Sequence, residues 1–413
     1  MGTRSRRARD HAASVSGQCI RIRMFNVGFG DCFLLFLPTV EGVKKVAIDC
    51  GSLKNKKHSI RAISDRLIAD VTDGDGVPRI DVLVMSHRHA DHISGYTNPK
   101  WAQVEVGEVW MPWLESRKDS VAMAIQKRQR AAAQALAVAV RKLNLGQGLA
   151  EIALNAQSNE DSLDVLHAGF AKRVTPRFFP ETEKVVEKIA TSALADVDVF
   201  VLGPPHDRDA LKDADPPDGQ TLLTGYSADS LTGPLEKLRP FSGDWADESG
   251  YWPDFDPVEI DRAASRAEMY EVAAAKIDAE INNTSLILIF RVGKDYLLFP
   301  GDAQWGPWEK ILSDDEAVEL LRKVTFLKVS HHASHNGTPA TLLKDILGKA
   351  NKRDGIVHAM ISMTPFAQWE GIPHTPILAT LSELSFPFAN SDVLGDQRGF
   401  TRDRDFSFDL ELK

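Results

Sequence analysis

An apolar segment that ends directly in four metal-capable side chains constrains this chain more than any other feature. The segment IDVLVMS at 80–86 is typical of a buried strand, and SHRHADH begins at its last residue. His87 and His89 are two residues apart, so an extended backbone directs both imidazoles to one side, and Asp91 and His92 follow. Imidazole and carboxylate are the ligands of zinc, manganese and iron in hydrolytic sites. The alternative, a polar strand end with solvated histidines, explains the cluster less well.

Two further strand-like segments end in ligand-type side chains. DYLLFPGD ends in Asp302, and VTFLKVS is followed by His331. Taken alone, Asp302 after a glycine is typical of a turn, and His331 is typical of polar surface. Three such strand ends in one chain instead favour a metal pair, with Asp302 as the bridging carboxylate.

Composition excludes several classes of protein. The chain has 413 residues, of which 43% are hydrophobic and 26% charged, which is enough for a large core. A net charge of -9 argues against a surface that coats nucleic acid, although a metal cleft supplies local positive charge. Three cysteines without a CxxC pair favour a reducing cytoplasm. No apolar run approaches the roughly 20 residues of a membrane helix, so we expect a cytoplasmic protein without membrane contacts.

The order of strand-like and helix-like segments predicts an α/β fold with a long insertion. Helical spacing predicts helices at 120–144, 161–170 and 259–281, whereas 197–205 is typical of a strand. We divide the chain into a disordered basic arm (1–18), the first half of the α/β domain (19–112), a largely helical and loop insertion (113–280) and the second half of the domain (281–413).

Several of these motifs resemble those of a known family. SHRHADH resembles the HxHxDH signature of the metallo-β-lactamase superfamily. The segments FNVGFGDCFLL, AIDCGS, NNTSLILIF, LLFPGDA and LKVSHHASHNG are similar, in the same order, to motifs of the hydrolase domain of bacterial DNA-uptake (competence) proteins. These motifs cover about 20–112 and 281–390. The resemblance implies a metallo-β-lactamase αββα sandwich that carries a large, mainly helical insertion.

The resemblance also implies two divalent metal ions, zinc or manganese. The ligands it implies are His87 and His89 for the first ion, Asp91, His92 and His331 for the second, and Asp302 as the bridge. It implies supporting roles for Asp31, Asp49, Asn283 and Ser285. Among these, Asp49 would orient a ligand histidine, whereas a tight turn explains Asp31 better than a role in the site does.

One departure from the wider superfamily affects the first metal. Lactamases and glyoxalases have a third histidine where this chain reads Asn282-Asn283-Thr284-Ser285, and the competence-type group also has asparagine there. An amide oxygen is a weaker ligand than imidazole. We therefore expect a looser first site that tolerates manganese.

The implied chemistry is hydrolysis by a water that the metals activate, with Asp91 orienting that water. His335 and His374 are candidates to protonate a leaving oxygen or contact a phosphate, although ordinary packing explains each equally well. We predict a phosphodiesterase or nuclease that acts on nucleic acid or a nucleotide. Two alternatives stay open. One is a small-molecule hydrolase for a lactone, thioester or β-lactam, and the other is a subunit active only within a complex, its protein partner bound by the 113–280 insertion.

Overall fold

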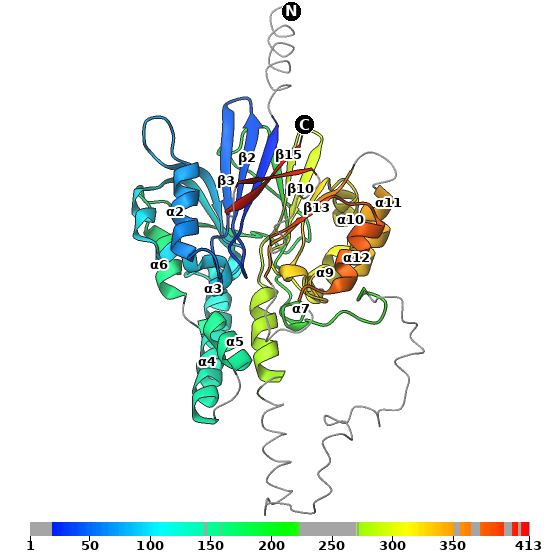
Figure 1. Cartoon of the computed structure of the whole chain (residues 1–413). Helices are drawn as coiled ribbons and strands as arrows, with labels where there is room; N and C mark the ends of the chain where they lie inside the picture. Colours follow the sequence, from blue (N-terminus) through cyan, green and yellow to red (C-terminus); the bar gives the residue numbers. More distant parts are fainter. Residues whose placement is uncertain are drawn as a thin grey trace, which may run out of the picture.

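A computed structural model describes residues 19–143, 147–157, 159–222, 270, 272–350, 356–364, 372–391, 399–403 and 406–412. The arm predicted at 1–18 lies outside these residues. Within them two β-sheets pack face to face with helices on both outer sides, so the predicted α/β class is confirmed (Figure 1). No helix among the described residues is long and apolar enough to cross a bilayer.

The first sheet joins the two ends of the described chain. Its eight strands, in spatial order, are β14 (Phe400–Asp403), β15 (Ser407–Leu412), β1 (Ile20–Phe25), β2 (Phe33–Thr39), β3 (Gly42–Ile48), β4 (Arg79–Val84), β5 (Glu105–Pro112) and β6 (Arg177–Phe179). Strands β14 to β3 are antiparallel, and β3 to β6 are parallel. All seven residues of β2 are buried, because the sheet is covered on both faces there.

The second sheet is built mainly from the later part of the chain. Its seven strands, in spatial order, are β13 (Phe388–Asn390), β12 (His358–Ile361), β11 (Phe326–Lys328), β10 (Asp295–Phe299), β9 (Ile287–Val292), β8 (Val197–Gly203) and β7 (Glu187–Ile189). Strands β10 to β13 are parallel, and β7 to β10 are antiparallel.

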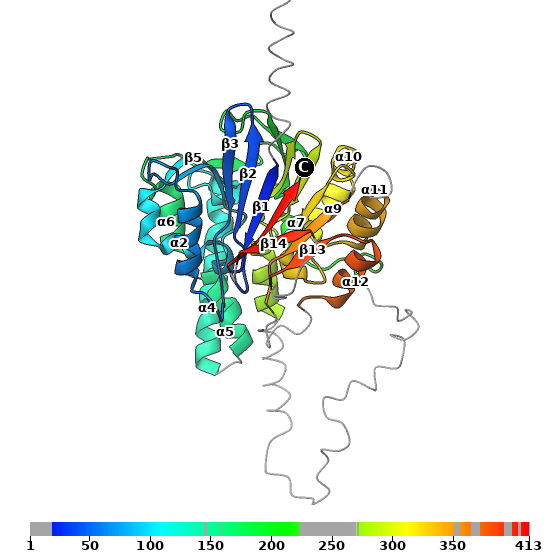
Figure 2. The ribbon, with the colours of Figure 1, turned by 45° about the horizontal axis from the view of Figure 1, so that its top comes forward.

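The main core lies between the sheets, where Phe33 of β2 meets Phe299 of β10 with ring centroids 5.6 Å apart. Two further apolar clusters cover the outer faces. Helices α2 (Ile60–Asp70) and α6 (Glu160–Ala168) pack on the first sheet, and α9 (Trp305–Leu312), α10 (Asp315–Leu321) and α12 (Thr375–Glu383) pack on the second (Figure 2). The result is a helix–sheet–sheet–helix order of layers.

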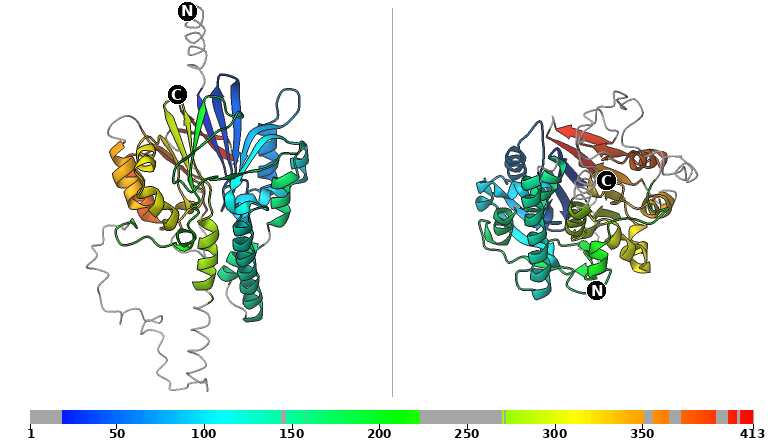
Figure 3. Two further views of the ribbon diagram at one scale, coloured as in Figure 1. Left: turned by 180° about the vertical axis from the view of Figure 1, so that it is seen from behind. Right: turned by 90° about the horizontal axis from the view of Figure 1, so that it is seen from below.

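The region 113–280 contributes both to the sheets and to a separate helical unit. Helices α4 (Ser120–Leu143) and α5 (Gln147–Gln157) pack with a helix over 272–282, and the three project beyond one end of the sheets (Figure 3). The predictions of a helix at 120–144 and a strand at 197–205 agree with α4 and β8. Residues 177–203, however, form three sheet strands, because β6 continues the parallel row after β5 and β8 pairs with β9. This part belongs to the layers and not to an insertion.

Candidate metal centre

The predicted ligands meet where strands of both sheets end. The loop after β4 carries His87, His89, Asp91 and His92, the last two on the short helix α3 (Ala90–Ile93). The loops after β10 and β11 bring Asp302 and the His331–His332 pair from the opposite sheet. The carboxyl ends of parallel strands are the common place for sites in layered α/β folds.

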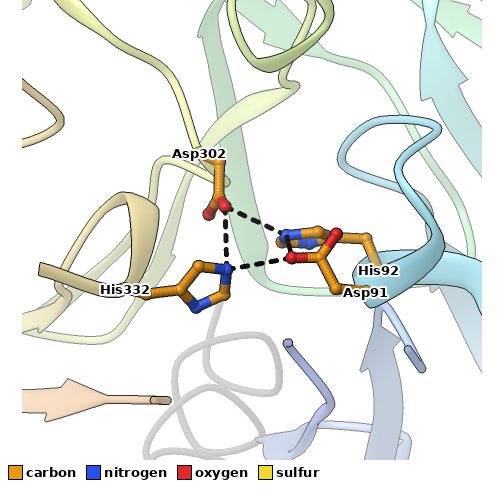
Figure 4. A group of neighbouring side chains, drawn as sticks. All are labelled: Asp91, His92, Asp302 and His332. Carbon is orange, nitrogen blue, oxygen red and sulfur yellow. Dashed lines mark hydrogen bonds and ion pairs between the residues drawn. The ribbon is translucent and has the colours of Figure 1, made fainter. Parts of the chain in front are cut away.

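Four buried side chains form the centre of this site (Figure 4). One carboxylate oxygen of Asp302, Oδ2, lies 3.1 Å from Nε2 of His92 and 3.1 Å from Nε2 of His332. Oδ2 of Asp91 lies 3.2 Å from Nε2 of His332. Their potential ligand atoms all lie within 4.8 Å of one another, so this group could hold a metal ion.

His87 and His89 form a second group beside the first. Nε2 of His87 lies 3.1 Å from Nδ1 of His89, and the His87 and His92 rings are 4.1 Å apart between centroids. Both side chains are buried. The HxH pair therefore presents two ring nitrogens to one point, as the alternation of an extended backbone requires.

Three imidazoles turn one nitrogen toward this centre while the protein holds the other. The holding contacts are His92 Nδ1 to Asp49 Oδ2 at 2.9 Å, His332 Nδ1 to the Ser362 carbonyl at 2.8 Å, and His87 Nδ1 to the hydroxyls of Ser86 at 3.1 Å and Ser285 at 3.3 Å. Such outer contacts fix the orientation of metal-ligating histidines. Asp91 Oδ1 is buried and has no hydrogen-bond partner among the described residues. The donor set therefore fits a divalent cation.

The residue after β11 that joins the centre is His332 and not His331, which corrects the sequence prediction. His331, His332 and Ala333 all have positive φ angles, and this left-handed turn directs the two neighbouring rings apart. Nε2 of His331 instead lies 3.2 Å from the Asn282 amide nitrogen. Burial lowers the pKa of His331 to about 4, so its ring is neutral at pH 7.

The neighbouring residues Asn282 and Asn283 have different contacts, a difference that the sequence did not indicate. Asn283 donates to the backbone carbonyls of Leu211 and Asp213 and accepts from the backbone of Gln304, so it holds loops together. Asn282 is the member that contacts a histidine of the site, because its amide nitrogen lies 3.2 Å from Nε2 of His331.

A buried lysine that sequence reasoning missed stands behind Asp302. Nζ of Lys328, on β11, lies 2.9 Å from Oδ1 of Asp302 and 2.5 Å from Oδ2 of Asp31. Burial acts to lower the lysine's pKa, but Asp302 and Asp31 outweigh it and raise the pKa above its usual value. A lysine inside the apolar run VTFLKVS was the available signal. The structure thus gives Asp31 a charged partner in addition to its place in a turn.

That turn packs directly under the α3 loop. The Asp31 amide donates to the Asp91 carbonyl at 2.9 Å. Gly30 has φ 141°, and a Cβ there would come within 2.4 Å of the same carbonyl. Only a residue without a side chain allows this close approach of the two backbones.

Charges within the centre displace the pKa values of its members in opposite directions. Burial would lower the pKa of His332, but Asp302, Asp91 and Asp31 outweigh burial and raise it to about 10. Burial would raise the pKa of Asp91, but His92 and His332 outweigh burial and lower it to about 2. Without an ion, His92 and His332 are therefore charged at pH 7 beside the Asp91 carboxylate, whereas burial lowers the pKa values of His87 and His89 and keeps both rings neutral.

A cavity of about 1000 Å³ opens onto this centre. His89, Asp91, Asp302 and His332 line it together with His335, His374, Lys212 and Lys276. The His335 and His374 rings lie 6.2 Å apart between centroids, and His374 Nε2 lies 2.6 Å from the Leu222 carbonyl. The two histidines singled out from the sequence therefore stand in the wall of the cavity and outside the centre itself.

No protein-family model matches this chain, and no curated protein matches it.

Proposed function

We propose that this protein is a metal-dependent hydrolase of the metallo-β-lactamase fold that cleaves phosphodiester bonds in nucleic acid or a nucleotide. The observation that carries the proposal is the buried group Asp91, His92, Asp302 and His332, with the His87–His89 pair beside it. The order of the layers and the position of the site at the strand ends also support this fold. Both are features that the sequence motifs imply.

The residues of the centre divide naturally between two ions. Nε2 of His87 and Nδ1 of His89 would bind the first ion, because these two atoms converge. Asp91, His92 and His332 would bind the second ion. Asp302 would bind the second ion through Oδ2, which contacts both of that ion's ligand histidines, and the sequence motifs imply that it would also bridge to the first ion.

The chemistry follows from the ligand set and its neighbours. Divalent ions bound here would lower the pKa of a water and offset negative charge in the transition state. Asp91, ionised and facing the cavity, would orient the attacking water through a carboxylate oxygen. Lys328 would keep Asp302 ionised. His335 and His374 stand where a leaving oxygen could take a proton.

The preference for a phosphodiester has three supports. The competence-type motifs imply nucleic acid, Lys212 and Lys276 offer positive charge in the cavity wall, and the cavity is large enough for a nucleotide-sized group.

The decisive experiment measures metal content and cleavage together. Purified protein is loaded with zinc or manganese, its bound ions are counted, and cleavage of single- and double-stranded DNA and RNA is followed. We expect two ions per chain and cleavage that His89→Ala and Asp302→Ala abolish. His58→Ala, which alters a histidine outside the cavity, is the matched control. Bound metal with activity only on an ester or lactone would replace the phosphodiester proposal, and absence of bound metal would refute the hydrolase.

A further inference from the structure

A helix from a region without matched motifs reaches the centre. Within residues 272–282, Asp278 and Asn282 are four residues apart and so lie on one helix face. The Asn282 amide donates to Oδ2 of Asp278 at 2.9 Å, and both residues line the cavity. This face of the helix is directed at the metal centre.

His89 lacks the outer contact that holds the other three imidazoles. Because its Nδ1 lies beside Nε2 of His87, its Nε2 is turned away from the shared point. That Nε2 is buried, and among the described residues it has no hydrogen-bond partner. Oδ1 of Asp278 lies 3.6 Å from it, slightly beyond hydrogen-bond length.

We propose that Asp278 is the positioning residue of His89, accepting a hydrogen bond from its Nε2–H so that Nδ1 is held toward the first metal. The inference rests on the proposed function, in which His89 is a ligand of that metal. Asp49 already makes the equivalent contact to His92 at 2.9 Å. A carboxylate–histidine pair would then serve each of the two ions.

The packing of the helical unit determines where Asp278 stands. Ala274 is buried against Leu136 of α4 and Ala153 of α5, and Ile281 packs near Ala133 of α4. Arg128 of α4 also forms an ion pair with Glu280. On this proposal the orientation of His89 depends on a helix outside the two sheets.

The test is metal binding by the full chain, with activity as a secondary readout. Cobalt and zinc affinities are measured by chelator competition, and the visible spectrum of cobalt reports the coordination of each ion. In Asp278→Ala we expect one ion to bind about 10- to 100-fold more weakly and the other to bind as in the wild type. Asp278→Glu should restore part of the loss. Asp215→Ala, which removes another carboxylate of the same cavity, should leave both affinities unchanged.

The outcomes separate this inference from the proposed function. A wild type that binds no ion contradicts the proposed function, and this inference falls with it. A wild type with two ions whose affinities and cobalt spectrum are unchanged in Asp278→Ala overturns this inference alone. If the alanine variant fails to fold, the nearly isosteric Asp278→Asn gives the same comparison, since its oxygen is a weaker acceptor for the ring N–H than a carboxylate.

Discussion

Lys328 binds one oxygen of the Asp302 carboxylate and leaves the other to the histidines. The lysine Nζ lies 2.9 Å from Oδ1 of Asp302, while Oδ2 contacts His92 and His332. The aspartate is thus held from behind by a fixed positive charge. Contacts within the protein therefore hold the oxygen that would face a metal ion in the proposed site.

Replacing this lysine should destabilise the metal-free protein strongly. Lys328→Met removes the ammonium group from between the buried Asp31 and Asp302 carboxylates, and breaking a buried pair costs about 3–5 kcal/mol. Denaturant unfolding without and with zinc measures the effect, and we expect the loss to shrink when ions supply the missing positive charge. Lys344→Met, on the surface, is the control. Equal stability of Lys328→Met and wild type would contradict the role given to the lysine.

Arg88 should be essential for the shape of the ligand loop. It lies between His87 and His89, and its guanidinium makes a bidentate pair with Glu115 at 2.9 and 2.8 Å, with both side chains buried. Arg88→Ala should lower the free energy of unfolding by about 3–5 kcal/mol, because Glu115 is left buried and unpaired.

A double-mutant cycle with Glu115→Ala tests this role of Arg88. The double variant should lose less stability than the sum of the two single variants. Arg79→Ala, in an exposed ion-pair network, should have little effect. Additive losses in the cycle would show that the Arg88–Glu115 pair does not act as a unit.

Metal binding should release protons and strengthen as pH rises. In the metal-free protein the pKa of His332 is raised to about 10, and that of His92 is also raised. Imidazolium cannot bind a cation, so each ring must lose its proton first. Calorimetry in buffers of different ionisation enthalpy counts these protons, and between pH 6 and 9 the affinity should increase. An affinity that is independent of pH would contradict the protonated resting state.

The raised pKa of His332 also predicts that the metal-free protein loses stability as pH rises, whereas metal affinity increases. A histidine whose folded pKa lies above its unfolded value of about 6.5 favours the folded state below that pH. This contribution should disappear as pH rises toward 10, the folded pKa of His332. Chemical unfolding with chelator present should therefore show falling stability over this range, and His332→Gln should flatten the profile.

Added metal should raise thermal stability, and chelation should reverse the change. An ion present at 100 times its dissociation constant adds about 2.7 kcal/mol to the folded state. His92→Ala removes a ligand of the central group and should abolish most of this gain. A melting temperature that responds equally to zinc in wild type and variant would place the bound metal elsewhere.

The strand-end motifs were sufficient to predict which loops meet. Each ligand in the centre follows a buried strand whose pattern is visible in the sequence, and Asp302 lies between the histidines of both halves. The choice between His331 and His332 was not accessible, because it depends on three consecutive residues with positive φ. Two adjacent histidines give no pattern that distinguishes their directions.

Residues that reach the site only through the packing of their helix could not be predicted from the sequence either. Asp278 reaches His89 only because its helix is docked on α4 and α5, and nothing local to DAEIN marks that contact. Strands β6 and β7 are each three residues long, too short for a periodic signal, so the region around them was assigned to an insertion.

The centre draws its parts from positions far apart in the chain, with 210 residues separating His92 from Asp302. During synthesis the loop after β4 therefore emerges long before the carboxylate and the histidine that face it. Until the segment through His332 has left the ribosome, an ion could meet only half of its ligands. Binding of an ion by the complete set of proposed ligands would therefore have to follow synthesis of the segment through His332.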